Sequence, residues 1–177
     1  MKRFLLLLIL ALCGAAYAPA QDRQRTELSG EGWYLWQDKD AAWREESPKL
    51  TYQEALSLPQ ASPTAGWEVL TSSQALPVRV PGTAEEYLAV QAGPEADIVG
   101  VTWWTRRFQA PAFKKGERVV LRFGSLRTRG EVFVNRKLAD YQIVANTPFV
   151  TDITDFIRPG EEVELAVRIT DAGGNLD

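Results

Sequence analysis

The sequence predicts an all-β domain, a jelly roll in which two antiparallel sheets form a sandwich. The main observation is an alternation of apolar and polar residues with a period of two between Arg118 and Ile169. This period is typical of β-strands, whereas a helix would show a period near 3.6. Turn sequences flank the runs at Lys115-Gly116-Glu117 and Arg158-Pro159-Gly160, where proline fixes φ and glycine permits tight reversal. We therefore expect about eight strands and one long early loop.

The alternation also predicts which side chains face the core. One apolar row faces inward and consists of Val119, Leu121, Phe123, Val132, Val134, Val163, Leu165, Val167 and Ile169. The intervening residues, among them Arg122 and Glu164, are expected to face solvent. An antiparallel sheet with one face on the core and one face in water is the simplest structure that fits this pattern.

In the first half of the chain, the sequence predicts fewer strands and helices. Strands are expected at Gly32–Gln37, Leu76–Val80 and Val101–Gln109. Asp38–Ala75 reads as a long excursion across the sandwich, with a short helix at Tyr52–Leu58. A second helix is expected at Thr83–Val90, because Thr83 and Glu86 have the spacing of a capping box.

The second half continues the strand pattern. Gln91–Gly100 is expected to be a loop, Thr147–Thr154 a strand and Asp155–Ile157 a short helical turn before Pro159. Asp171–Asp177 contains two glycines and no closing strand, so we interpret residues 171–177 as the start of a linker to further domains. The sandwich itself is assigned to residues 33–170.

The first twenty residues have the pattern of an export signal. Lys2 and Arg3 precede an apolar run, Phe4–Leu12, that is too short to cross a bilayer as a helix. Cleavage after Ala20 is expected, followed by a flexible lead-in over residues 21–32. A lipid anchor at Cys13 is the alternative, disfavoured because Leu12 is larger than the residue usual before such a cysteine. The protein is thus expected in the periplasm or outside the cell, without a membrane span.

Composition excludes several classes of function. The chain has 177 residues, a net charge of −3 and no histidine. The acidic balance argues against a nucleic-acid partner. The absence of histidine excludes histidine-dependent triads and imidazole metal sites, and Asp152 with Asp155 supply too few oxygens for calcium. We therefore expect no cofactor and no metal, with Asp152 and Asp155 bonding the backbone of their turn.

Seven motifs, in order, resemble one known family. They span about 140 residues and are LSGEGWYLWQD (28–38), VRVPGT (78–83), GVTWWTRRFQAP (100–111), KGERVVLRFGSL (115–126), EVFVNRKLADY (131–141), TPFVTDIT (147–154) and PGEEVELAVRI (159–169). This order is similar to that of the N-terminal sugar-binding domain of glycoside hydrolase family 2, the β-galactosidase, β-glucuronidase and β-mannosidase group. Two departures stand out: Arg136 replaces the family's turn glycine, and Gln142–Ala145 replaces a His-x-Gly-Gly sequence.

The resemblance implies a galactose-binding-like jelly roll, followed by an immunoglobulin-like domain and a TIM barrel in the same chain. In that family two barrel glutamates perform retaining hydrolysis of O-glycosidic bonds. Neither lies in this chain, so the 177-residue segment is expected to be non-catalytic. The parent protein is expected to be a glycosidase acting on β-linked glycans.

The carboxylates and arginines of the segment itself favour structural roles. Adjacent acids such as Glu161 and Glu162 point to opposite faces of a strand, so they do not form a catalytic pair. Arg122, Arg127 and Arg129 surround a hairpin. We interpret them as a solvated turn, with an ion-pair contact to a downstream domain as the alternative.

Four residues are candidates for carbohydrate binding, namely Trp43, Trp67, Trp103 and Asn146. Aromatic rings stack on sugars, but tryptophans in strands also fill cores. Trp103 and Trp104 are neighbours in a strand, so only one of them can lie between the sheets. Asn146 precedes Thr-Pro-Phe at the edge that faces sugar in the related family.

Three functional hypotheses follow. The first is the accessory domain of an exported glycosidase, supported by the motif order. The second is a free-standing carbohydrate-binding module without catalysis, supported by the export signal and the six tryptophans. The third is an interaction domain that holds a multidomain assembly, which would expose an apolar face when isolated.

Overall fold

The computed structural model describes residues 23–43, 61–93, 98–127 and 129–171. The predicted signal, Cys13, the helix at Tyr52–Leu58 and the end of the chain after residue 171 lie outside these ranges. The described strands are β1 (Gly30–Asp38), β2 (Leu76–Val80), β3 (Gly100–Gln109), β4 (Val120–Phe123), β5 (Arg129–Val134), β6 (Lys137–Gln142), β7 (Phe149–Asp152) and β8 (Glu162–Asp171). The described helices are η1 (Trp67–Thr71), α3 (Ala84–Ala92) and η2 (Thr154–Phe156).

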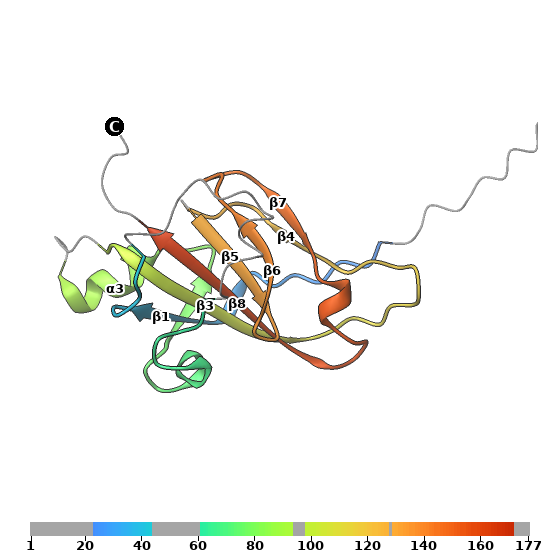
Figure 1. The fold of residues 1–177 in the computed structure, drawn as a ribbon, viewed down its shortest axis with the longest axis horizontal. Helices are drawn as coiled ribbons and strands as arrows, with labels where there is room; N and C mark the ends of the chain where they lie inside the picture. The colour runs from blue at the N-terminus through green and yellow to red at the C-terminus, as the bar shows by residue number, and fades with distance from the viewer. Residues whose placement is uncertain (1–22, 44–60, 94–97, 128, 172–177) are drawn as a thin grey trace, which may run out of the picture.

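The strands form two antiparallel sheets, which confirms the predicted all-β sandwich. The large sheet has six strands in the order β2-β1-β3-β8-β5-β6, and the small sheet pairs β4 with β7 (Figure 1). β3 and β8 form the centre of the large sheet, paired from Gly100↔Asp171 to Gln109↔Glu162. Strands that are far apart in the sequence thus lie side by side, as the jelly-roll prediction required.

The main core lies between the two sheets and is built from the predicted inward row. Val132, Val134, Val163 and Leu165 are at most 1% exposed. Leu121 of the small sheet packs against them. Asp140 of β6 also accepts a hydrogen bond from the Thr151 hydroxyl of β7 at 2.6 Å, which links the two sheets across the core.

The outer face of the large sheet is also buried, so the prediction of one solvated face is wrong. Every residue of β5 is buried, and Phe133, which was expected to face solvent, is 1% exposed. Residues 61–71, which we call the strap, cross this face and bring Val69 and Leu70 into a second apolar cluster. The alternation could not reveal this cover, because the strap comes from the irregular excursion.

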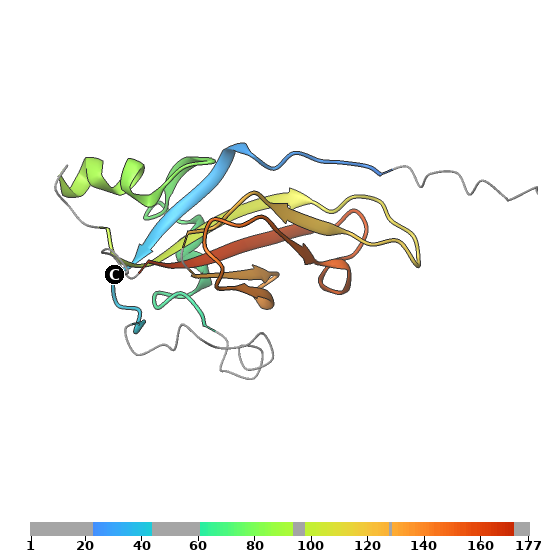
Figure 2. The ribbon, with the colours of Figure 1, turned by 90° about the horizontal axis from the view of Figure 1, so that it is seen from above.

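The helix α3 begins as predicted but ends at Ala92 rather than at Val90. The loop predicted at Gln91–Gly100 therefore starts later than expected, and its residues 94–97 lie outside the described ranges. The Thr83 hydroxyl accepts a hydrogen bond from Glu86 N–H, and the Glu86 carboxylate accepts one from Thr83 N–H, which forms the capping box. Leu88 of α3 joins the core between the sheets. Figure 2 shows α3 and the strap on opposite sides of the large sheet.

The predicted turns and the short helical turn are confirmed. Gly116 and Gly160 have φ values of 94° and 76°, which glycine adopts without steric cost. η2 covers most of the turn expected at Asp155–Ile157. β7 is shorter than the expected Thr147–Thr154, since Thr154 begins η2.

The segment before β1 is attached to the sandwich. β1 begins at Gly30 rather than at residue 32 or 33. The Leu28 carbonyl accepts hydrogen bonds from Trp33 Nε1 at 2.7 Å and from Arg106 Nη1 at 2.7 Å. Arg106 also donates to the Glu31 carbonyl at 2.6 Å, so side chains of the sheet hold this entry segment in place.

Candidate functional site on the outer face of the large sheet

Aromatic side chains gather where the strap crosses the large sheet. The Trp67 ring meets Trp103 and Phe133 edge-on, with centroids 5.5 Å and 5.6 Å away. Trp103 and Phe133 lie 5.4 Å apart. Edge-to-face geometry is a favoured packing of aromatic rings. The three rings lie at the centre of the second apolar cluster, which we call the outer-face cluster.

A buried carboxylate fastens one end of the strap. Asp38 ends β1 and is 2% exposed. Its Oδ2 accepts hydrogen bonds from Trp103 Nε1 and from Thr64 N–H, both at 3.1 Å, and its Oδ1 accepts one from the Thr64 hydroxyl. Three donors compensate the burial of one carboxylate, and they join the sheet to the strap.

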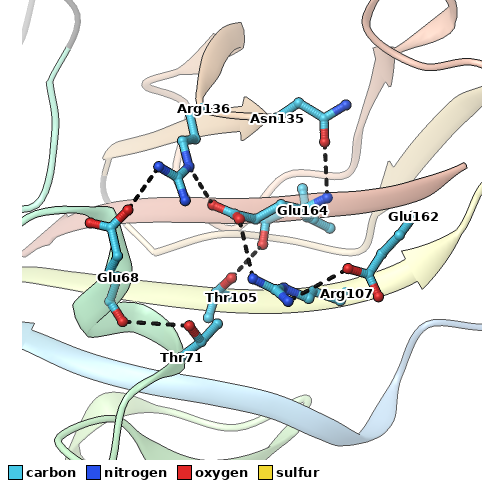
Figure 3. Close-up of polar contacts among 9 residues, drawn as sticks. Glu68, Thr71, Thr105, Arg107, Asn135, Arg136, Glu162 and Glu164 are labelled. Atoms are coloured by element: carbon cyan, nitrogen blue, oxygen red, sulfur yellow. Dashed lines mark hydrogen bonds and ion pairs between the residues drawn. The ribbon is translucent and has the colours of Figure 1, made fainter.

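An arginine at a tight turn fastens the other end. Asn135 and Arg136 connect β5 to β6 and both have positive φ, 51° and 66°, as in a two-residue type I′ hairpin. Arg136 donates to Glu68 of the strap at 3.0 Å and to Glu164 of β8 at 3.3 Å (Figure 3). Its guanidinium also lies 6.0 Å from the centre of the Trp67 ring.

The ion pairs continue across the sheet as a chain. Glu164 also contacts Arg107 at 3.6 Å, and Arg107 contacts Glu162 at 3.5 Å (Figure 3). A hydrogen bond from its own backbone N–H, followed by the contact with Arg136, lowers the pKa of Glu68. These carboxylates are therefore partnered by arginines, and none has the apolar, charge-poor surroundings of a catalytic acid.

The structure brings three of the four predicted sugar-binding residues together. Trp43, Trp67 and Trp103 all belong to the outer-face cluster. Asn146 lies elsewhere, in the exposed loop between β6 and β7, where its N–H donates to the Leu126 carbonyl at 2.9 Å. The four residues thus do not form one site.

Two of these tryptophans have structural tasks that compete with stacking on a sugar. Trp103 is 0% exposed, so its ring lies in the core of this structure, and a sugar contact at this residue remains a prediction. Trp104 lies on the other face, between the sheets, which confirms that only one of the pair occupies that core. Trp67 is half-buried and is shielded by Arg136.

Trp43 packs on the start of β3. A Cβ atom at Gly100 would lie 3.0 Å from Trp43 Nε1, so glycine at this position allows the indole to approach the backbone. Gly100 has a φ of 102°, which also favours glycine. Trp43 remains half-buried, and its sugar contact remains a prediction.

Arg122, Arg127 and Arg129 were expected to form a solvated turn, but two of these three arginines have carboxylate partners. Arg127 bonds Asp171 at 2.9 Å and Glu85 at 3.2 Å. Arg129 is buried and bonds Glu131 at 2.6 Å; Glu131 in turn accepts from Arg168 at 3.2 Å. A buried arginine requires such carboxylate partners. The sequence pattern could not predict the contact between Glu131 and Arg168, because these residues are far apart in the chain.

Asp152 has the structural role predicted for it. It accepts hydrogen bonds from the Thr154 hydroxyl at 2.6 Å and from Thr154 N–H at 3.0 Å, and it pairs with Arg118. In order of size, the Thr154 bonds and then Arg118 lower the pKa of Asp152. Within the described ranges, no group of three or more acidic, histidine or cysteine side chains could hold a metal ion.

The described part of the chain contains no helix that is long and apolar enough to cross a membrane.

The fold is that of a β-sandwich domain found within β-glucuronidases. The chain superposes with a TM-score of 0.59 on the Ruminococcus gnavus β-glucuronidase, at 21% identity, covering 86% of this chain and 22% of that one. The β-glucuronidase of an uncultured Clostridium gives 0.56 at 24% identity, with 86% and 23% covered. The Faecalibacterium prausnitzii enzyme gives 0.53 at 26% identity, with 86% and 22% covered. The predicted similarity to the N-terminal domain of glycoside hydrolase family 2 is thereby confirmed.

A curated relative gives the same class of protein. A β-glucuronidase of Formosa agariphila is 29% identical over 76 residues, which are 43% of this chain and 8% of that protein. The comparison with protein-family models finds no match. The chain thus covers less than a quarter of the length of the solved neighbours and 8% of the length of the curated relative. It contains a domain related to glycoside hydrolases.

Proposed function

We propose that this chain is the N-terminal accessory domain of an exported, retaining β-glycosidase whose catalytic glutamates lie in a downstream TIM barrel. The observation that carries the proposal is the match of 86% of this chain to about a fifth of a β-glucuronidase. The carboxylates of Glu68, Glu162 and Glu164 support a non-catalytic role, because arginines pair with each of them. The partners are an immunoglobulin-like domain and the barrel of the same polypeptide.

Terminal β-glucuronides are the substrate class that the comparisons favour. The three solved neighbours and the curated relative are all β-glucuronidases. Specificity in barrel enzymes resides in barrel loops, so the sandwich contributes support and at most one edge of the pocket. We assign that edge to the loop predicted at Gln91–Gly100.

The experiment is a hydrolysis assay of the protein encoded by the complete reading frame. Chromogenic β-glucuronide, β-galactoside, β-mannoside and β-glucoside are supplied in parallel, and we expect release of the chromophore from the glucuronide. A stop codon directly after Asp177 in intact genomic sequence, or no hydrolysis of any of the four, would contradict the proposal.

Export is tested on the mature protein. N-terminal sequencing of the secreted or periplasmic form is expected to begin at Gln21. A mature form that begins at a lipid-modified Cys13 would instead assign the protein to a membrane surface.

A further inference from the structure

The Arg127 side chain joins the helix α3 to the last residue of strand β8. Its Nε contacts the Asp171 carboxylate at 2.9 Å, and its Nη1 donates to the Glu85 carboxylate at 3.2 Å. Glu85 lies in the first turn of α3, and Asp171 ends β8. Both elements lie at the same end of the sandwich (Figures 1 and 2). One guanidinium thus holds the beginning of α3 against the end of β8.

The register of the large sheet shows which part of the chain this bridge spans. Asp171 pairs with Gly100, the first residue of β3. The chain runs from α3 to β3 without an intervening strand or helix in the described ranges. Arg127 therefore contacts the beginning of the segment 84–100 directly, and it contacts the end of that segment through the strand partner of Gly100. The bridge holds both ends of this segment together.

The Arg127 side chain extends from a part of the β4–β5 connection that is itself held in place. A Cβ atom at Gly130 would collide with the Leu126 side chain, so glycine at this position lets Leu126 pack closely on β5. The Leu126 carbonyl accepts a hydrogen bond from Asn146 N–H at 2.9 Å. The residue before Arg127 is thus fixed through its side chain and its backbone, which gives the guanidinium a fixed base.

The helix α3 has a second polar contact, which acts on a different strand. The Tyr87 hydroxyl bonds the backbone of Arg79 in β2, and Leu88 packs in the core between the sheets. These contacts place α3 relative to the edge strand and the core. Arg127 places it relative to β8, which is the neighbour of β3 in the sheet.

We propose that Arg127 is a positioning residue for substrate binding in the intact enzyme. This inference rests on the proposed function, in which the loop before Gly100 forms one edge of the substrate pocket. The described ends of that loop are Gly93 and Gly100. Arg127 fixes the helix that precedes Gly93 and the strand that pairs with Gly100. It acts through Glu85 and Asp171, without contacting substrate itself.

The kinetics of β-glucuronide hydrolysis by the intact protein test this role. In Arg127→Ala we expect KM to rise about fivefold and kcat to stay within about twofold, because exposed ion pairs contribute modestly and their loss displaces a binding edge rather than the catalytic groups. Glu85→Gln removes only the contact with α3 and should raise KM about threefold. Arg158→Ala is the matched control, because it removes an exposed ion pair with Glu161 near the other end of β8; it should leave both constants unchanged.

Amide hydrogen exchange supplies a measurement that does not depend on hydrolysis. The Gly93 N–H donates to the Ala89 carbonyl at 2.8 Å at the end of α3. We expect this amide to exchange about threefold faster in Arg127→Ala than in the wild type, because the helix loses one of its attachments. Unchanged exchange at Gly93 would overturn the inference.

The kinetic outcomes separate this inference from the proposed function. An active enzyme whose KM is the same in the wild type and Arg127→Ala would overturn the role of Arg127 and leave the proposed function intact. An equal rise of KM in Arg158→Ala would also overturn it, because the effect would then follow from net charge alone. A wild type that hydrolyses no glycoside would refute the proposed function, and the inference with it.

Discussion

The second residue of the β5–β6 turn, Arg136, combines an unfavourable backbone with favourable contacts. Its φ of 66° would normally select glycine, because a side chain in the left-handed region costs about 1 kcal/mol or more. Arg136 nevertheless joins the turn to β8 through Glu164 and to the strap through Glu68. The position thus exchanges backbone strain for a connection between three segments.

Two substitutions at Arg136 separate the backbone effect from the contacts. Arg136→Ala and Arg136→Gly both remove the ion pairs, but only alanine retains the left-handed strain. We expect Arg136→Ala to be the less stable variant by about 1 kcal/mol, measured as the free energy of unfolding in urea. Equal stabilities of the two variants would show that the turn relaxes and that φ at this position carries no cost.

We predict that Asp152 contributes to the loss of fold stability at acidic pH. Its pKa in the folded protein lies below the ordinary value of 3.8, so the ionised carboxylate stabilises the fold above that pH. This stabilisation is lost as the pH falls through the lowered pKa. Asp152→Asn, which retains an acceptor for Thr154, should therefore flatten the decline in thermal stability below about pH 4. A decline as steep as in the wild type would contradict this role.

At the scale of elements, Asp38 determines whether the strap stays on the sheet. Asp38→Ala would leave the buried Trp103 N–H without its acceptor, at a cost of about 1–3 kcal/mol. We expect this loss in chemical denaturation followed by tryptophan fluorescence. Thr64→Val is the matched control, because it removes one strap contact but leaves the bond to Trp103. Equal losses in both variants would indicate that the Trp103 bond contributes little.

The Tyr87 hydroxyl occupies backbone groups on the open edge of strand β2. Tyr87 of α3 donates to the Arg79 carbonyl at 3.0 Å and accepts from Arg79 N–H at 3.1 Å. These bonds occupy groups that an exposed edge would offer to another strand. Tyr87→Phe should accelerate amide exchange at Arg79, with a loss of about 1 kcal/mol in stability. Unchanged exchange at Arg79 would mean that α3 does not protect this edge.

The sequence predicts local features of these elements well and long-range contacts poorly. The Thr83–Glu86 capping box and the turn at Gly160 depend on neighbouring residues, so their patterns are readable. The strap, the Asp38 bonds and the burial of Arg129 depend on segments that meet only in the fold. Trp103 illustrates the consequence: its position in a strand was evident, but its burial depends on a strap that no periodicity reveals.

At the scale of the whole molecule, the strap covers the outer face of the large sheet, whereas Val120 and Val150 on the small sheet are about half exposed. The strap explains why the large sheet is buried on both sides. The match to about a fifth of several β-glucuronidases is the basis of the accessory role that we propose. The candidate sugar residues Trp43 and Asn146 belong to different parts of the fold, since Trp43 packs on the start of β3 and Asn146 lies in the loop between β6 and β7.

The most direct test of the central claim, that this sandwich serves a retaining β-glycosidase, is the anomeric configuration of the first product. Proton NMR during hydrolysis of a β-glucuronide by the intact protein should show β-glucuronic acid before any α-anomer, because a double displacement retains configuration. Initial release of the α-anomer, or no release of sugar, would contradict the account.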